Sequence, residues 1–402
     1  MQYSYKAKNK KGEITTGEMS AQDIDELSSK LSRLGSVLMS SEEIDKKKGN
    51  IEISKILKRV SIVDKMLFTR HLGVMLRAGL PFSRAVTVLA EQTSNAYFKD
   101  ILLQVKEDIQ KGNQLGSSLE KHPKAFNSLF VNMIRVGETS GNLEEVLDIL
   151  YVQLKKDHQL TSKIKGAMMY PSVIVFAMVV IGALMMTYVI PSLLEVFTDA
   201  GVELPTSTKV ILFVSNSFQN YGIYILIGTI LSIYLFLKII KTNKGKRAFD
   251  YTLLHLPTIG KIISKVNMAR FTRTLSSMIA SGVPIVKALD IISETLGNVY
   301  YQDSIRESSA GVQKGVSLSE VIKKYDKLYF PLMLHMIEVG EETGTLQETL
   351  KQVAEFYEDE VEQITSNLSA IIEPVLMLVI GGGVGLFAVS IIQPMYSIME
   401  TM

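Results

Sequence analysis

Residues 168–190 read MMYPSVIVFAMVVIGALMMTYVI and carry no charged side chain. A helix of about 20 apolar residues crosses the hydrocarbon core of a bilayer, so this stretch is long enough to span a membrane. Two more apolar stretches follow, one at 221–240, whose late Lys238 can extend its charge to the membrane surface, and one at 375–392. We therefore predict three transmembrane helices, at 167–190, 221–240 and 371–393.

The segment before the first span recurs later in the chain at a constant offset. Phe68 of FTRHLGVMLRAGLP corresponds to Phe271 of FTRTLSSMIASGVP, and 271 − 68 = 203. The same offset aligns Gly112 with Gly315 and, at the start of the outer spans, Pro171 with Pro374. A register held without a gap over this length indicates a duplicated unit, in which a helical segment is followed by a membrane helix.

Each copy is predicted to be a compact bundle of six helices joined by short turns. Apolar residues recur at helical spacing from residue 61 onward, and glycine or proline stands between the periodic segments. In the first copy we expect helices from 61 to the Gly79-Leu80-Pro81 break and then at 81–93, 97–111, 115–121, 127–139 and 143–165. The fold class is therefore mainly α, with bundles at 61–166 and 241–370.

A small α+β module is predicted at the N-terminus, at 1–39. Alternating residues on both sides of Lys10-Lys11-Gly12 indicate a β-hairpin, and the apolar face of Ile24, Leu27 and Leu31 indicates a following helix, with Ser20 as its N-cap. Residues 40–60 are charged and lack apolar periodicity, so we interpret them as a linker.

Lysine and arginine set the expected orientation. Basic residues cluster before the first span and after the second, at 155–165 and 241–247, whereas the segment 191–220 between these spans has a single lysine. By the positive-inside rule both bundles are expected to be cytoplasmic. The loop 191–220 and the tail 394–402 are then expected on the other side of the membrane.

The composition argues against several classes of enzyme. The chain has no cysteine, its five histidines are scattered, and its formal net charge of +2 gives no reason to expect nucleic acid as a partner. The glycines of GNQLGSS at 112–118 lack the spacing and the lysine of a nucleotide-binding loop. We expect no catalytic site, no metal site and no cofactor.

One motif is duplicated with its surroundings, as VGETSGNL at 136–143 and VGEETGTL at 339–346. Its glycines and carboxylates are the candidate partner-contact or structural residues: Gly137, Glu138, Gly141, Gly340, Glu341 and Gly344. Gly141 and Gly344 suit the left-handed residue after a helix, and Asn142 with Glu145 has capping-box spacing. Glu138 and Glu341 stand in the last turn of a helix, where the dipole disfavours a carboxylate. Either an inter-helix hydrogen bond or contact with a partner would account for them.

Residues at and within the spans form a second candidate set. Tyr170-Pro171 and Glu373-Pro374 stand where the outer spans are expected to enter the membrane. Glu373 is ambiguous, because a carboxylate costs little at the membrane interface and much inside it. Gly381 and Gly385 form a small-xxx-small face that favours close helix packing within the membrane.

These residues together resemble the type II secretion system protein F family. The resemblance rests on the tandem FTR repeats, the VGE corners, the Tyr-Pro and Glu-Pro pairs and the opening YKAKNKKGEITTGEM, so it covers essentially the whole chain. It implies a platform protein of the bacterial inner membrane that takes part in type IV pilus assembly and has no catalysis of its own.

The partners implied by the resemblance are a cytoplasmic hexameric ATPase, pilin subunits, other inner-membrane assembly proteins and lipid. A homo-oligomer, a dimer or a tetramer, is also implied. One alternative is the platform of a type II secretion or competence pseudopilus. Another is a small-repeat membrane transporter, although the predicted spans lack the embedded ionisable residues that a transport site uses.

Overall fold

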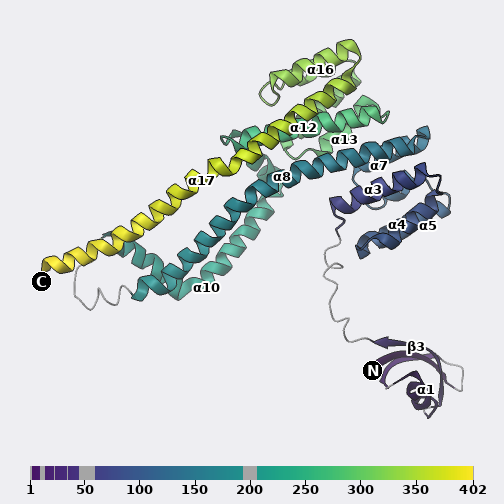
Figure 1. The fold of residues 1–402 in the computed structure, drawn as a ribbon, viewed down its shortest axis with the longest axis horizontal. Coiled ribbons are helices and arrows are strands. Elements are labelled where there is room, and N and C mark those ends of the chain that lie inside the picture. Colours follow the sequence, from purple (N-terminus) through teal and green to yellow (C-terminus); the bar gives the residue numbers. More distant parts are fainter. Residues whose placement is uncertain are drawn as a thin grey trace. The chain divides into compact units, whose positions relative to one another are not determined.

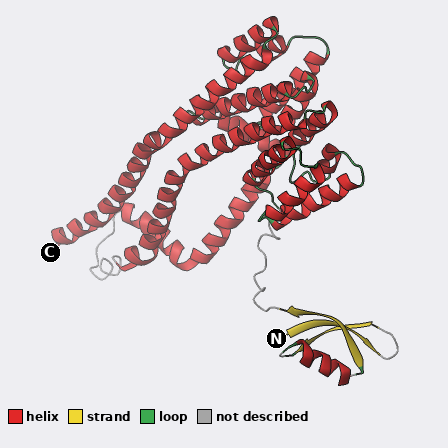
Figure 2. Cartoon of the chain, turned by 45° about the vertical axis from the view of Figure 1, so that its right-hand side comes forward, coloured by secondary structure: helices red, strands yellow, loops and turns green. Residues whose placement is uncertain are grey.

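The computed structural model describes residues 2–9, 14–21, 23–33, 35–44, 59–192 and 206–401. Strands are confined to the N-terminal module, and helices make up almost all of the remaining described residues (Figures 1 and 2). The described chain divides into two compact units, of which the second holds 61–92 and 101–402. The first holds the N-terminal module, and each unit is treated by itself.

The N-terminal module is a three-stranded antiparallel sheet with one helix. Its strands lie in the order β2-β1-β3, and Ala7, Ala21, Leu27 and Leu31 form its core. The elements are β1 (Gln2–Asn9), β2 (Ile14–Ser20), α1 (Ile24–Arg33) and β3 (Ser36–Ile44).

The module differs from the sequence prediction in two respects. The predicted linker begins inside β3, which continues to Ile44; this strand was missed because its second half is polar. Helix α1 begins later than predicted, and Asp23 rather than Ser20 caps it, since the Glu26 N–H donates to Asp23 Oδ1 at 2.7 Å. The predicted turn at 10–12 lies outside the described residues.

The first repeat contains the six helices expected from the sequence. Its first helix begins with a complete capping box, in which Ser61 and Asp64 each accept a hydrogen bond from the other's backbone N–H. The helices are α3 (Ile62–Arg77), α4 (Phe82–Gln92), α5 (Ala96–Gln110), α6 (Leu115–Glu120), α7 (Ser128–Ser140) and α8 (Leu143–Leu184).

The second repeat follows the same plan and adds one helix before it. The helices are α11 (Asn243–His255), α12 (Ile259–Ala280), α13 (Ile285–Thr295), α14 (Val299–Gln313), α15 (Leu318–Lys323), α16 (Pro331–Thr343) and α17 (Leu346–Thr401). Its core contains buried tyrosines. The rings of Tyr301 and Tyr329 meet edge to face at 5.3 Å, and the Tyr329 hydroxyl lies 2.6 Å from Ser304 Oγ. Burial raises the pKa of Tyr301 to about 12.

Three described helices are long and apolar enough to cross a membrane, as predicted. They do not begin where we expected. Helix α8 runs unbroken from the first bundle through Pro171, and α17 runs from the second bundle through Pro374 to Thr401, so 166/167 and 370/371 are not structural breaks and the predicted tail is helical up to Thr401 (Figure 1). An internal proline removes one backbone hydrogen bond, which membrane helices tolerate.

The predicted loop 191–220 is also partly helical. Helix α10 (Thr206–Ile240) begins within it and bends at Tyr221, where the backbone leaves helical geometry (φ −122, ψ 16). The first arm of α10 is hydrogen-bonded to both outer spans, because Thr208 Oγ1 donates to the Ser390 carbonyl at 2.9 Å and Ser215 Oγ donates to the Met186 carbonyl at 2.6 Å.

The Met186 carbonyl is free for this bond because of local sequence. Residues Met185–Val189 form a π-helical turn, in which the Ile190 N–H bonds the Met185 carbonyl. The next donor in that pattern would come from residue 191, which is proline and has no N–H. The hydroxyl of Ser215 supplies the missing donor.

Candidate functional site

The duplicated carboxylates cap a neighbouring helix in each repeat. Glu138 on α7 accepts hydrogen bonds from the backbone N–H groups of Leu115 (2.7 Å) and Gly116 (3.1 Å) at the start of α6. Glu341 on α16 does the same for Leu318 (2.6 Å) and Ser319 (2.8 Å) at the start of α15. A helix N-terminus carries unpaired N–H groups and partial positive charge, so each carboxylate satisfies both at once.

These bonds explain why a carboxylate stands in an unfavourable last turn. Each carboxylate is disfavoured by the dipole of its own helix, and the hydrogen bonds that it accepts at the start of another helix offset this electrostatic cost. That helix start lies 22 or 23 residues earlier in the chain. The inter-helix alternative therefore accounts for both carboxylates within one chain. Contact with a partner stays a prediction for this motif.

The glycines of the motif allow a close approach of two helices. A Cβ on Gly137 would lie 2.9 Å from Val146 Cβ, and one on Gly340 would lie 2.2 Å from Thr349 Oγ1 and 3.0 Å from the backbone of Leu346. Gly141 and Gly344 end their helices in the left-handed region, at φ 73 and φ 70.

The predicted capping box after the first corner does not form. Asn142 makes no side-chain cap to the N-terminus of α8, and its amide bonds the Glu145 carboxylate instead. The backbone of Asn142 (φ −111, ψ 37) is outside the extended region that an N-cap residue uses, so its side chain cannot reach the third N–H.

An ionic cluster joins the two repeats, and its Arg273 and Glu358 are buried. Arg273 on α12 donates two hydrogen bonds to Glu358 on α17, from Nε (2.8 Å) and Nη2 (3.0 Å). Lys156 on α8 reaches the same carboxylate at 3.0 Å. The Arg273 and Glu358 side chains are only 8% and 12% exposed. One carboxylate thus holds both cations, and the helices of both outer spans meet at it.

A polar contact lies beside this cluster, between α8 and α12. The Gln153 amide donates to Thr274 Oγ1 and accepts from Ser277 Oγ, both at 3.0 Å. Arg270 donates to Asp157 at 2.9 Å and to Thr161 at 3.1 Å. The hydrogen bonds at Gln153 use the donor and the acceptor of one amide, which fixes how the two helices face each other.

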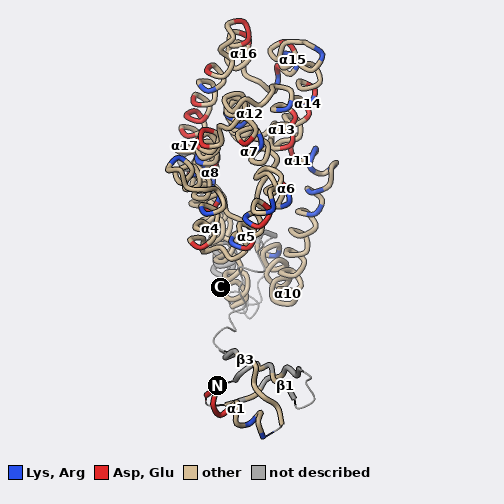
Figure 3. The backbone as a smooth tube through the Cα atoms, turned by 90° about the vertical axis from the view of Figure 1, so that its right-hand side faces the viewer, with Lys and Arg blue, Asp and Glu red and all other residues tan. Residues whose placement is uncertain are grey.

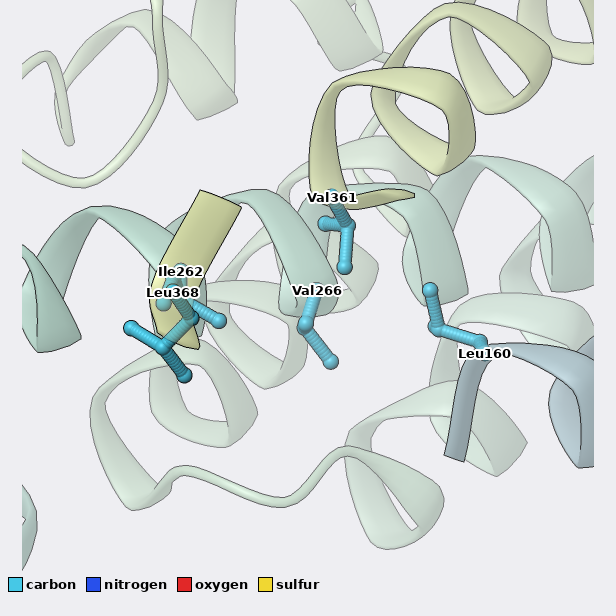
Figure 4. Close-up of a cluster of buried hydrophobic side chains, with 5 residues drawn as sticks. All are labelled: Leu160, Ile262, Val266, Val361 and Leu368. Atoms are coloured by element: carbon cyan, nitrogen blue, oxygen red, sulfur yellow. The ribbon is translucent and has the colours of Figure 1, made fainter. Parts of the chain in front are cut away.

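An apolar cluster lies where the junction continues toward the spans. Leu160 of α8, Ile262 and Val266 of α12, and Val361 and Leu368 of α17 point toward one another (Figure 4). We call the ionic cluster, the polar contact and this apolar cluster together the junction. Charged residues gather on the bundle helices, whereas α10 is almost free of them (Figure 3).

The residues predicted at the membrane lie within continuous helices. Pro171 is buried, whereas Tyr170, Glu373 and Pro374 are exposed. A Cβ on Gly381 or Gly385 would meet no described atom within 4 Å. The predicted close packing at these glycines is therefore not made inside the described part of this chain, and it stays a prediction for contact with another helix.

Comparison with known proteins identifies the family. A family model described as "Type II secretion system (T2SS), protein F" matches residues 68–191 and again 271–394. The chain belongs to this family. The two matches coincide with the two repeats, each from its first bundle helix to the end of its outer span.

Relatives of the family match from 83% to all of this chain. "Type IV pilus assembly protein PilC" of Myxococcus xanthus is 34% identical over 99% of this chain and 95% of its own length. The protein of the same name from Thermus thermophilus is 32% identical over all of this chain and 98% of its own length. "Type II secretion system protein F" of Vibrio cholerae is 31% identical over 83% of this chain and 82% of its own length.

Sequence reasoning did not find the junction. Arg273, Glu358 and Lys156 come from three separate helices, and each is an ordinary charged residue on an amphipathic helix. One difference between the repeats in sequence could have pointed to Glu358. The counterpart of Glu358 in the first repeat, 203 residues earlier, is Lys155, so the bidentate pair of the second repeat has no equivalent in the first. Arg70, the counterpart of Arg273, lies over the ring of Tyr151 at 4.8 Å instead.

Proposed function

We propose that this protein is the inner-membrane platform of a type IV pilus assembly machine. It transmits the motion of a cytoplasmic ATPase to pilin subunits in the bilayer and catalyses no reaction itself. One observation carries the proposal: α8 and α17 each pass from a bundle into a membrane span without a break, and the junction ties them together.

Continuous helices suit this role because a helix transmits displacement along its axis. A loop between bundle and span would absorb a push as changes in backbone dihedral angles. In this chain a displacement of either bundle moves the attached span directly. The junction makes the two outer spans move together, because Glu358 is bonded to helices of both repeats.

The proposed location follows from the basic residues beside the spans. Both bundles face the cytoplasm, where the hexameric ATPase docks on them, and the spans contact pilin, lipid and other inner-membrane assembly proteins. The protein acts as a homo-oligomer. Three relatives named for type IV pilus assembly match 97–100% of this chain, whereas three named for type II secretion match 82–84%, which favours the pilus over a secretion pseudopilus.

The test combines a measurement of ATPase binding with a variant that interrupts α8 between the bundle and the span. Full-length protein in detergent is expected to bind the pilus assembly ATPase of the same organism saturably and to show no ATP turnover alone. Two glycines inserted after Gly166 add about 200° of rotation and flexible residues between bundle and span. This variant is expected to bind the ATPase normally and to assemble no pili in cells.

The matched control is the same insertion after Gly112. This residue lies in an open turn (φ +86), where an added Cβ would meet nothing within 4 Å. The control should still assemble pili. Normal piliation by the Gly166 insertion would exclude rigid transmission through α8, and absence of ATPase binding by the intact protein would exclude the motor platform.

A further inference from the structure

The contact between the two repeats is made by different faces of each. The first repeat presents Leu129 and Val136 of α7 and Gln153 of α8, which we call the outgoing face. The second repeat presents Arg270, Thr274 and Ser277 of α12, which we call the receiving face. Gln153 bonds Thr274 and Ser277, Leu129 lines a small pocket with Arg270 and Thr274, and Val136 lies beside the turn after α12.

Each face has an uncovered counterpart in the other repeat. At the offset of 203 residues, the outgoing face of the second repeat consists of Leu332, Val339 and Phe356. Leu129 is 9% exposed but Leu332 is 45% exposed, and Gln153 is 7% exposed but Phe356 is 44% exposed. The positions that are covered in the first repeat are therefore open in the second.

The receiving face of the first repeat is open in the same way. Its residues are Leu67, His71 and Val74 on α3, the counterparts of Arg270, Thr274 and Ser277. Thr274 is 5% exposed, whereas its counterpart His71 is exposed. Val74 is 54% exposed, whereas its counterpart Ser277 is half-buried. Each chain therefore has one open outgoing face, on the second repeat, and one open receiving face, on the first repeat. Inside the chain, an outgoing face and a receiving face bind each other.

The open faces carry apolar side chains at positions where a surface exposed to water is expected to be polar. Where the covered contact uses Gln153, the open face has Phe356. Where the covered contact uses Arg270 and Ser277, the open face has Leu67 and Val74. Exposed apolar side chains stand at positions where the contact inside the chain is polar, which indicates that these faces are covered in the assembled protein.

We propose that the outgoing face of one chain (Leu332, Val339 and Phe356) binds the receiving face of a second copy (Leu67, His71 and Val74). The contact between chains then repeats the contact between repeats, so that first and second repeats alternate around the assembly. Such a contact is heterologous, because two different surfaces meet.

The direction of the membrane helices favours a closed ring. Lys156 pairs with Glu358 and Lys163 with Glu362, so α8 and α17 run parallel beside each other (Figure 1). The rotation that relates the repeats therefore has its axis close to the direction of the spans. Rotation about such an axis keeps the spans of successive copies parallel. Because every copy must keep its spans in the bilayer, this favours a closed ring over a filament that rises out of the membrane.

The chain has no cysteine, so any disulfide in a cysteine variant must join the introduced residues. Phe356 corresponds to Gln153 and His71 to Thr274, whose side chains are bonded across the internal contact. His71→Cys and Phe356→Cys chains with different tags are expressed together, and the isolated membranes are treated with copper phenanthroline, which catalyses thiol oxidation by O₂. A mixed disulfide dimer is expected. The double variant Gln153→Cys/Thr274→Cys should close a disulfide within one chain and is the positive control.

The negative control pairs Phe356→Cys with Leu103→Cys. Leu103 is another exposed apolar residue of the first repeat, and its counterpart Arg306 pairs with Asp303 on the same helix and is not part of the receiving face defined above. No mixed dimer is expected from this pair. Equal cross-linking at residues 71 and 103, or none at 71 while the positive control closes, would overturn the proposal.

A second measurement identifies what covers α3. With the photoreactive residue p-benzoylphenylalanine in place of Leu67, adducts in cells are expected on α16 or α17 of another copy. Adducts confined to residues 1–44 of the same chain or to the assembly ATPase would overturn the proposal. The inference rests on the homo-oligomer proposed above but not on its role in pilus assembly, so an oligomer joined elsewhere would overturn the inference alone.

Discussion

Replacing Glu341 by glutamine tests the capping of α15 by a carboxylate. The glutamine oxygen can accept one of the two N–H groups of Leu318 and Ser319, and its NH₂ group then faces the other. The loss is one charge-assisted hydrogen bond, about 1.5–3 kcal/mol, and the interaction with the helix dipole, about 0.3–1 kcal/mol. A total of about 3 kcal/mol lowers the Tm of a domain of this size by about 6–12 °C.

Thermal unfolding in detergent, followed by circular dichroism, measures this shift, since the chain has no tryptophan for fluorescence. Glu342→Gln is the matched control, because it removes an exposed carboxylate from the next position on the same helix. It should change stability by less than about 0.5 kcal/mol. Equal Tm values for the two variants would refute the capping argument. An unchanged Tm for Glu341→Gln together with weaker ATPase binding would instead support a partner contact.

Three more predictions concern the junction and the bundle cores. Arg273→Met should destabilise the protein by about 3 kcal/mol because Glu358 loses its bidentate partner, and Arg273→Met/Glu358→Leu should recover most of that loss; additive losses in thermal melts would contradict this. Gly340→Ala should cost about 2–3 kcal/mol by overpacking, against about 1–2 kcal/mol for Gly344→Ala, and a reversed order of Tm would contradict the close helix approach. Burial raises the pKa of Tyr301 from 10.0 to about 12, so its contribution to stability is complete below pH 10 and is lost as pH rises through about 12. In a titration followed by tyrosinate absorbance, Tyr301→Phe should show one fewer tyrosine that ionises near pH 12 than the parent protein.

Much of the local structure could be predicted from the sequence. The length of the uncharged stretches determines the three spans, and the offset of 203 residues determines the two repeats. The first five helices of the first repeat, and the start of the sixth, were predicted with nearly the right bounds because glycine and proline stand between them. The polar strand β3 and the first arm of α10 were missed, since their patterns are too weak to separate from a loop.

The spans, the repeats and the helices could be predicted because they depend on local signals. Apolar periodicity, charge and turn residues indicate which side of a helix or strand is buried. They do not report what buries it. Glu138 and Glu341 could be singled out as unusual, but their partners are N–H groups of another helix, which only the packing of α7 on α6 and of α16 on α15 brings within reach.

The tertiary structure alone decided the junction and the continuity of α8 and α17. The sequence shows a proline at the start of each outer span, and whether a helix continues through it depends on how the surrounding helices offset the lost hydrogen bond. Likewise Lys156, Arg273 and Glu358 are typical surface residues of three separate helices. They become one ionic cluster, in which Arg273 and Glu358 are buried, because the two repeats pack with different faces. The similarity of the two repeats in sequence does not specify that arrangement.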